Sequence, residues 1–237
     1  MRMQKNRRLR PGQIIFRARF INLLIFILAL IAIQPFGEAI GKLSLLVHII
    51  TSAILVSAIY AIGQKTRHTV IGILLVVPLL ISMWAKQLLE IRWLQIPESV
   101  IGITFYGFII TLILKFIFNK DEIKADMIAG AAAVYLLLAI AWAYAYGFIE
   151  LILPGSFAMA EAQNITRSIA IYYSFVTITT LGYGDIFPVS TAAKSFAIIE
   201  AVVGQLYLVI TVAWLVGVHV SQKLTKKSSA NKLDNQK

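Results

Sequence analysis

The 237-residue sequence contains no cysteine and few charged residues. Without cysteine, disulfides, thiol catalysis and cysteine-bound metals are excluded. Only 14% of the residues are charged and 59% are hydrophobic, whereas about a quarter of a typical soluble domain is charged. Apolar runs of about 20 residues recur along the chain, and the short alternating segments of a membrane β-barrel are missing. The sequence therefore predicts an all-α membrane protein that crosses the bilayer several times.

Six apolar runs are expected to span the membrane, and polar or proline- and glycine-containing connections separate them. They cover approximately residues 20–33, 43–62, 69–85, 100–118, 127–153 and 191–219. The basic segment before the first run could also belong to a cleavable signal peptide, but no small-x-small cleavage site follows it.

The 22 basic residues outnumber the 11 acidic ones, and they gather between the apolar runs. This distribution is typical of membrane topology, so we expect no nucleic-acid partner. If the N-terminus is cytoplasmic, 17 of the 22 basic residues lie on the cytoplasmic side. The positive-inside rule thus predicts six spans with both termini in the cytoplasm. The basic ends are expected to contact anionic lipids there.

The segment Thr179–Asp185, with the sequence TTLGYGD, lies between the last two apolar runs. Non-helical backbone at membrane depth is tolerated only where it is buried in protein or lines a water-filled path. Before it, Asn164-Ile165-Thr166 can cap a helix that runs to about Ile178, which is too short to cross the membrane. We therefore expect a re-entrant helix whose C-terminal end, with its partial negative charge, favours a cation.

Gly182 and Gly184 can adopt backbone dihedral angles that other residues avoid, so successive carbonyl groups can face one side. Thr180 adds a hydroxyl group at the deep end of the segment. Four such segments around an axis would stack rings of oxygen atoms that replace the hydration shell of an ion. Because the chain has one copy of the segment, a homotetramer is expected.

The TTLGYGD segment resembles the selectivity filter of potassium channels, TVGYG, with Leu181 where Val or Ile is commoner. The resemblance covers the pore unit, about residues 127–221. It implies that K⁺ binds to backbone carbonyl groups, with the Thr180 hydroxyl as a further ligand; the residues concerned are Thr180, Leu181, Gly182, Tyr183 and Gly184.

Other residues match supporting positions of the same family. Tyr172 and Tyr173 match an aromatic pair around the filter, and Asp185 matches the acid that holds its outer end. Val176 stands where some bacterial members carry a glutamate partner for that acid. Gly204 matches the glycine hinge of the inner helix.

The resemblance implies six transmembrane helices plus a re-entrant pore helix and filter, assembled as a homotetramer in the plasma membrane (the bacterial inner membrane). The expected division is a basic cytoplasmic N-terminus (1–19), a four-helix transmembrane domain (20–118), a pore domain (119–221) and a basic cytoplasmic tail (222–237). The expected function is passive K⁺ permeation, with no catalysis and no cofactor. A less selective monovalent cation channel is the nearest alternative. A transporter or membrane-embedded enzyme would need an internal repeat or polar clusters in other spans, and neither is visible.

The fourth apolar run lacks the arginines of a voltage sensor. Residues 100–114 contain no Arg or Lys. Each charge that crosses the field supplies only about 2.3 kcal/mol per 100 mV, so a sensor needs several charges. The sequence therefore predicts a pore with little voltage dependence and leaves its opening stimulus open.

Glu200 and His48 are ionisable residues that fall inside predicted spans. Glu200, about three turns into the last span, is either a functional group or a hydrogen-bonded glutamate packed behind the filter, and we favour the second interpretation. His48, in the second span, is expected to make an interhelical hydrogen bond rather than to act as a ligand.

Overall fold

The computed structural model describes residues 19–39, 41–63, 65–89, 94–120, 124–159 and 165–234. Its helices are α2 (Arg19–Ala39), α3 (Gly41–Ile62), α4 (Thr66–Leu89), α5 (Gln95–Phe118), α6 (Ala125–Ile152), α7 (Arg167–Ile178) and α8 (Thr191–Asp234). Two short strands, β1 (Phe157–Met159) and β2 (Ile186–Pro188), pair antiparallel. The basic N-terminal segment before Arg19 and the predicted cap residue Asn164 lie outside the described residues.

Five helices, α3, α4, α5, α6 and α8, are long and apolar enough to cross a membrane. The chain is thus a mostly helical, multi-pass membrane protein. The first predicted span corresponds to α2, whose apolar part Arg19–Gln34 is shorter than the other five. A sixth span therefore stays a prediction.

The last helix continues well beyond the predicted end of its apolar run near Ser221. α8 extends through the lysine- and serine-containing tail to Asp234. No glycine or proline follows Gly217 to interrupt the helix. The tail thus extends the helix, and the loss of hydrophobicity marks the end of the apolar segment only.

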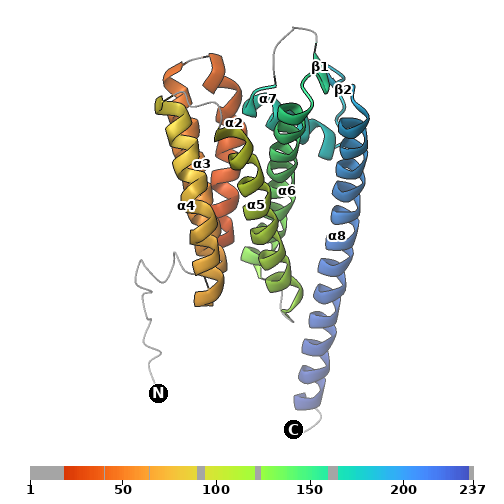
Figure 1. The fold of residues 1–237 in the computed structure, drawn as a ribbon. Coiled ribbons are helices and arrows are strands. Elements are labelled where there is room, and N and C mark those ends of the chain that lie inside the picture. Colours follow the sequence, from red (N-terminus) through yellow and green to blue (C-terminus); the bar gives the residue numbers. More distant parts are fainter. Residues whose placement is uncertain are drawn as a thin grey trace.

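The helices run alongside one another, with α7 and the two strands gathered at one end of the molecule (Figure 1). Helices α2, α3, α4 and α5 are called the four-helix unit below. α2 packs against α3 and α6, and α5 packs against α6, so this unit packs against the first helix of the predicted pore domain. Fully buried Ile27, Leu55, Ile109 and Leu137 belong to this shared core. α8 lies on the other side of α6 and extends past the remaining helices at the opposite end (Figure 1).

Asp126, in the first turn of α6, joins that helix to the start of α2. Its Oδ1 atom accepts hydrogen bonds from the backbone N–H groups of Phe20 (2.9 Å) and Ile21 (3.2 Å). The first N–H groups of a helix have no partner within the helix, so this carboxylate caps α2 from outside. The four-helix unit is therefore attached to α6 at this end by hydrogen bonds as well as by packing.

Candidate functional site

Helix α7 begins and ends where the sequence predicts. The side chain of Thr166 accepts a hydrogen bond from the Ile169 N–H group at 3.2 Å and so caps the N-terminus. The helix ends at Ile178, and the Thr179 hydroxyl donates to the Phe175 carbonyl at 2.6 Å. With 12 residues, α7 is about 18 Å long, well short of the roughly 30 Å hydrocarbon core of a bilayer.

The backbone after α7 alternates in handedness along the TTLGYGD segment. Thr180, Gly182 and Gly184 have positive φ angles of 60°, 58° and 77°, whereas Leu181 and Tyr183 between them do not. In an extended strand successive carbonyl groups point to opposite sides, but an alternation of right- and left-handed residues can turn them to one side. The N–H groups of Leu181 and Gly182 are occupied by the Val176 carbonyl, at 3.0 and 3.3 Å. The segment can therefore present a row of carbonyl oxygens.

Tyr172 holds the C-terminal end of the segment. Its hydroxyl donates to Asp185 Oδ2 at 2.7 Å, and Asp185 Oδ1 accepts from the Ile186 N–H group. The hydrogen bond to Asp185, together with burial, raises the pKa of Tyr172 to about 12. The phenol thus stays a donor across the neutral and mildly alkaline range.

Tyr173 packs on a different side of α7 from its neighbour. Its ring lies 4.9 Å from that of Tyr146 on α6 and 5.3 Å from that of Phe157 on β1. The two tyrosines that the sequence predicts around the filter therefore contact different parts of the same chain. Tyr172 contacts the TTLGYGD segment, and Tyr173 packs α7 against α6 and β1.

The C-terminal end of α7 is fixed at the Ile178 carbonyl. The Tyr135 hydroxyl of α6 donates to this carbonyl at 2.9 Å. On the other side α8 approaches so closely at Gly204 that an added Cβ would lie 2.6 Å from Ile178 Cγ1 and 3.0 Å from the Ile178 oxygen. Gly204, predicted as a hinge, is thus a close-packing position between α8 and the end of α7.

Glu200 is fully buried behind α7 and is hydrogen-bonded. It accepts hydrogen bonds from the Tyr146 hydroxyl of α6 and the Ser174 hydroxyl of α7. Ser174 also lies within hydrogen-bonding distance of the Ala139 carbonyl, at 2.6 Å. One carboxyl group therefore joins α6, α7 and α8, as the favoured interpretation of Glu200 expects.

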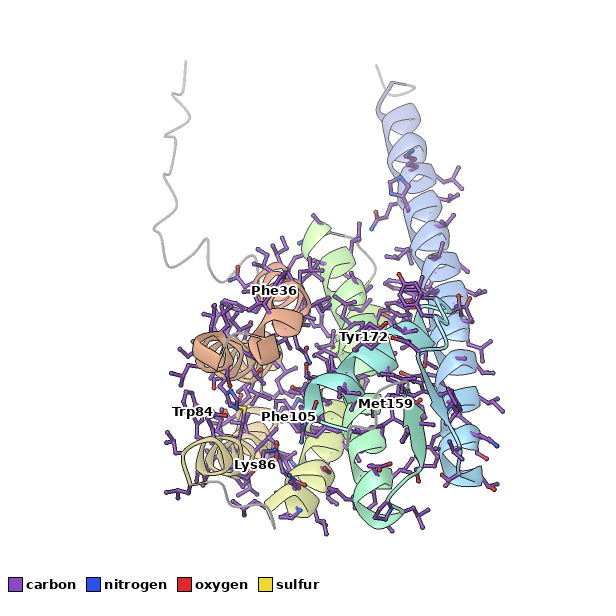
Figure 2. The ribbon with its side chains drawn as sticks, turned by 90° about the horizontal axis from the view of Figure 1, so that it is seen from above. Phe36, Trp84, Lys86, Phe105, Met159 and Tyr172 are labelled. Atoms are coloured by element: carbon purple, nitrogen blue, oxygen red, sulfur yellow. The ribbon has the colours of Figure 1, made fainter. Side chains whose placement is uncertain are left out.

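A buried ion cluster at the start of α7 was not anticipated from the sequence. Glu98 of α5, 2% exposed, lies 2.9 Å from Lys86 Nζ and 3.0 Å from Arg167 Nη2. The Arg167 guanidinium also stacks 3.7 Å from the centre of the Tyr144 ring. Lys86 lies on the side of α4 next to α5 (Figure 2). The cluster ties the first residue of α7 to the four-helix unit.

His48 makes its hydrogen bond within its own helix, so the expected interhelical bond is wrong. The Nδ1 atom lies 2.7 Å from the Ser44 carbonyl one turn earlier. The interhelical contact of His48 is instead a ring contact with Trp84 of α4, with centroids 5.9 Å apart. Among the described residues no group of three or more His, Cys, Asp or Glu could hold a metal ion.

A short capped helix, a glycine-containing segment of alternating handedness and an apolar helix follow one another along the chain. Residues 132–220 match the family model described as "Ion channel". The chain is also 40% identical over 52 residues to "Two pore potassium channel c" of Oryza sativa subsp. japonica. These 52 residues cover 22% of this chain and 11% of that protein. No solved structure matches the chain. Residues 132–220 therefore carry an ion channel domain.

Proposed function

We propose that the protein conducts K⁺ passively and selectively through a pore formed by four copies of the chain. The carbonyl groups of Thr180, Leu181, Gly182, Tyr183 and Gly184, with the Thr180 hydroxyl, coordinate the ion. The observation that carries the proposal is the alternating handedness of this segment, which follows a short helix. Hydrogen bonds hold the backbone on both sides of it, from Tyr135 to the Ile178 carbonyl and from Tyr172 to Asp185. A less selective monovalent cation channel is the second candidate, since Leu181 departs from the commoner filter sequence.

The exposure of the filter segment supports a homotetramer. In a single chain Leu181 is 54% and Tyr183 66% exposed, and nothing lies within 4 Å of a Cβ added at Gly182 or Gly184. A single row of carbonyl groups cannot replace the hydration shell of an ion on all sides. The apolar side chains of α8, among them Val202 and Val209, are also widely exposed, as expected of a helix that faces lipid and neighbouring copies.

The proposed setting is the plasma membrane, with both termini in the cytoplasm and anionic lipids against the basic ends. In this orientation the Tyr172–Asp185 pair lies at the outer mouth. The opposite end of α8 carries Lys223, Lys226 and Lys227, which suit the negative surface potential of a cytoplasmic leaflet.

K⁺ selectivity is the first expected result. The full-length protein in vesicles with a K⁺ gradient should give a reversal potential that follows K⁺ and changes little when Na⁺ replaces an inert cation. A reversal potential that follows Na⁺ would favour the second candidate.

The opening of the pore should depend only weakly on voltage, because the only charged residues of α5 are Glu98 and Lys115. Steep activation with several gating charges per subunit would contradict this prediction.

Tyr172→Phe should weaken the outer end of the filter. The substitution keeps the ring and removes the donor to Asp185, a loss of about 1 kcal/mol for one partly exposed hydrogen bond. We expect a severalfold decrease in steady K⁺ flux with little change in protein stability. Because the pKa of Tyr172 is about 12, the wild-type bond should persist from pH 7 to pH 10. Tyr60→Phe, in the four-helix unit, is the control, and equal losses in the two variants would contradict the assignment.

A further inference from the structure

A recess of about 340 Å³ lies between α2 and α7. Its apolar lining residues include Ile31, Ile171 and Phe175, and its polar lining residues are Gln34, Ser168 and Tyr172. Such a volume is at the lower end of the range of small-molecule sites, which are mostly apolar with a few polar groups. No charged side chain lines it. The recess is therefore unsuited to a free ion, whose burial there would lack a counter-charge.

Gln34 is the polar group that the fold leaves incomplete. It is 7% exposed, and its Nε2 atom donates a long hydrogen bond of 3.4 Å to the Ser168 carbonyl. Its Oε1 atom is buried and has no hydrogen-bond partner among the described residues. Buried polar atoms in proteins nearly always have a partner, so an unpaired acceptor on a residue that lines a recess points to a ligand with a donor. The contact with Ser168 also fixes which amide atom is the acceptor, because a carbonyl can only accept.

We propose that this recess binds an amphiphile with one hydroxyl group, whose O–H donates to Gln34 Oε1 and whose hydrocarbon chain packs on Ile31, Ile171 and Phe175. A hydroxyl supplies the missing donor, and an alkyl chain suits the remaining wall. The hydroxyl can belong to a free long-chain alcohol or to the glycerol of a lipid headgroup. The chemistry at Gln34 is the same in both cases.

The site adjoins the outer end of the filter through Tyr172. This residue lines the recess, and its hydroxyl bonds to Asp185. An occupant that contacts the Tyr172 ring changes the packing of the group that holds Asp185. An effect of the amphiphile on K⁺ flux rests on the proposed function, whereas its binding does not.

Binding can be measured without any ion current. The full-length protein in phosphatidylcholine vesicles is exposed to a diazirine-bearing octanol, irradiated and analysed by mass spectrometry of its peptides. We expect saturable labelling confined to α2 and α7, with competition by 1-octanol at least about tenfold stronger than competition by methyl octyl ether. The ether has a similar chain but no O–H donor, so this comparison needs no substitution.

Gln34→Leu removes the acceptor with little change in size and should lower this labelling about tenfold. Gln87→Leu, an exposed residue of α4, makes the same chemical change elsewhere and should leave it unaltered. Vesicles with added phosphatidylglycerol distinguish the two sources. A decrease in labelling identifies a lipid headgroup as occupant, and unchanged labelling identifies a free alcohol; both outcomes support a hydroxyl site.

Three results would overturn the site: equal competition by the ether, equal labelling in the two variants, or no saturable label on α2 and α7. The last would mean that solvent, lipid tails or a neighbouring copy of the chain fills the recess. K⁺ selectivity measured in the same vesicles separates the two proposals, since a selective channel without the label rejects only the site.

Discussion

Gly182→Ala should abolish selective K⁺ flux while leaving the protein folded. Gly182 has a φ angle of +58°, where an L-residue costs about 1–2 kcal/mol. In a pore of four chains the strain adds to about 4–8 kcal/mol if the filter keeps its conformation, so the filter should instead change shape. We expect flux to fall at least a hundredfold, measured as K⁺ uptake into vesicles at equal protein density.

Gly155 provides a matched control for this substitution. It also has a positive φ angle, +80°, and nothing lies within 4 Å of an added Cβ. It lies in the turn after α6, remote from the TTLGYGD segment in the sequence. Gly155→Ala should thus carry a similar strain and retain most of the flux. Normal selective flux in Gly182→Ala, or an equal loss in Gly155→Ala, would show that the backbone of the filter segment is not what sets permeation.

The helices that the sequence predicts best are those defined by hydrophobic length and a cap. α7 follows from the cap at Thr166 and the glycines after Ile178, because both signals are local. The end of α8 was missed because loss of hydrophobicity ends a membrane segment without ending a helix. Asp185 was predicted from the motif, and its bond to Tyr172 needs only the turn after α7 to bring the two together.

The rest of the site depends on contacts between distant parts of the chain. The resemblance implies a hinge at Gly204, which stays a prediction. The closeness of Gly204 to Ile178 follows from how α8 packs on α7, which the sequence pattern does not contain. Gln34 lies at the end of an apolar run and gives no sign that it meets Ser168. Glu98 carries no pairing signal, since its partners lie in a different helix and at the start of α7.

Glu98→Gln should destabilise the protein and loosen the start of α7. Its carboxylate balances Lys86 and Arg167, and a cation at a helix N-terminus is unfavourable without such a partner. Removing one partner of a buried ion pair costs roughly 3–5 kcal/mol, and we expect the low end because the side chains of Lys86 and Arg167 are 26% and 29% exposed. The lower thermal unfolding temperature of the purified protein measures this loss.

Two control variants separate the ion cluster from a general effect of lost charge. Lys86→Met leaves the Glu98–Arg167 pair intact and should cost less than about 1 kcal/mol, as for a partly exposed ion pair. Glu150→Gln also removes one negative charge, but it keeps one of the two oxygens that accept from the backbone N–H groups of Gly155 and Ser156, and its effect should be smaller than that of Glu98→Gln. A Glu98→Gln protein as stable as the wild type, or less damaged than Lys86→Met, would contradict the cluster's role. If K⁺ flux falls with stability only in Glu98→Gln, the attachment of α7 to α5 holds the pore helix in place. In the part of the chain that the structure describes, the Glu98–Arg167 pair is the ion pair that joins α5 to the first residue of α7.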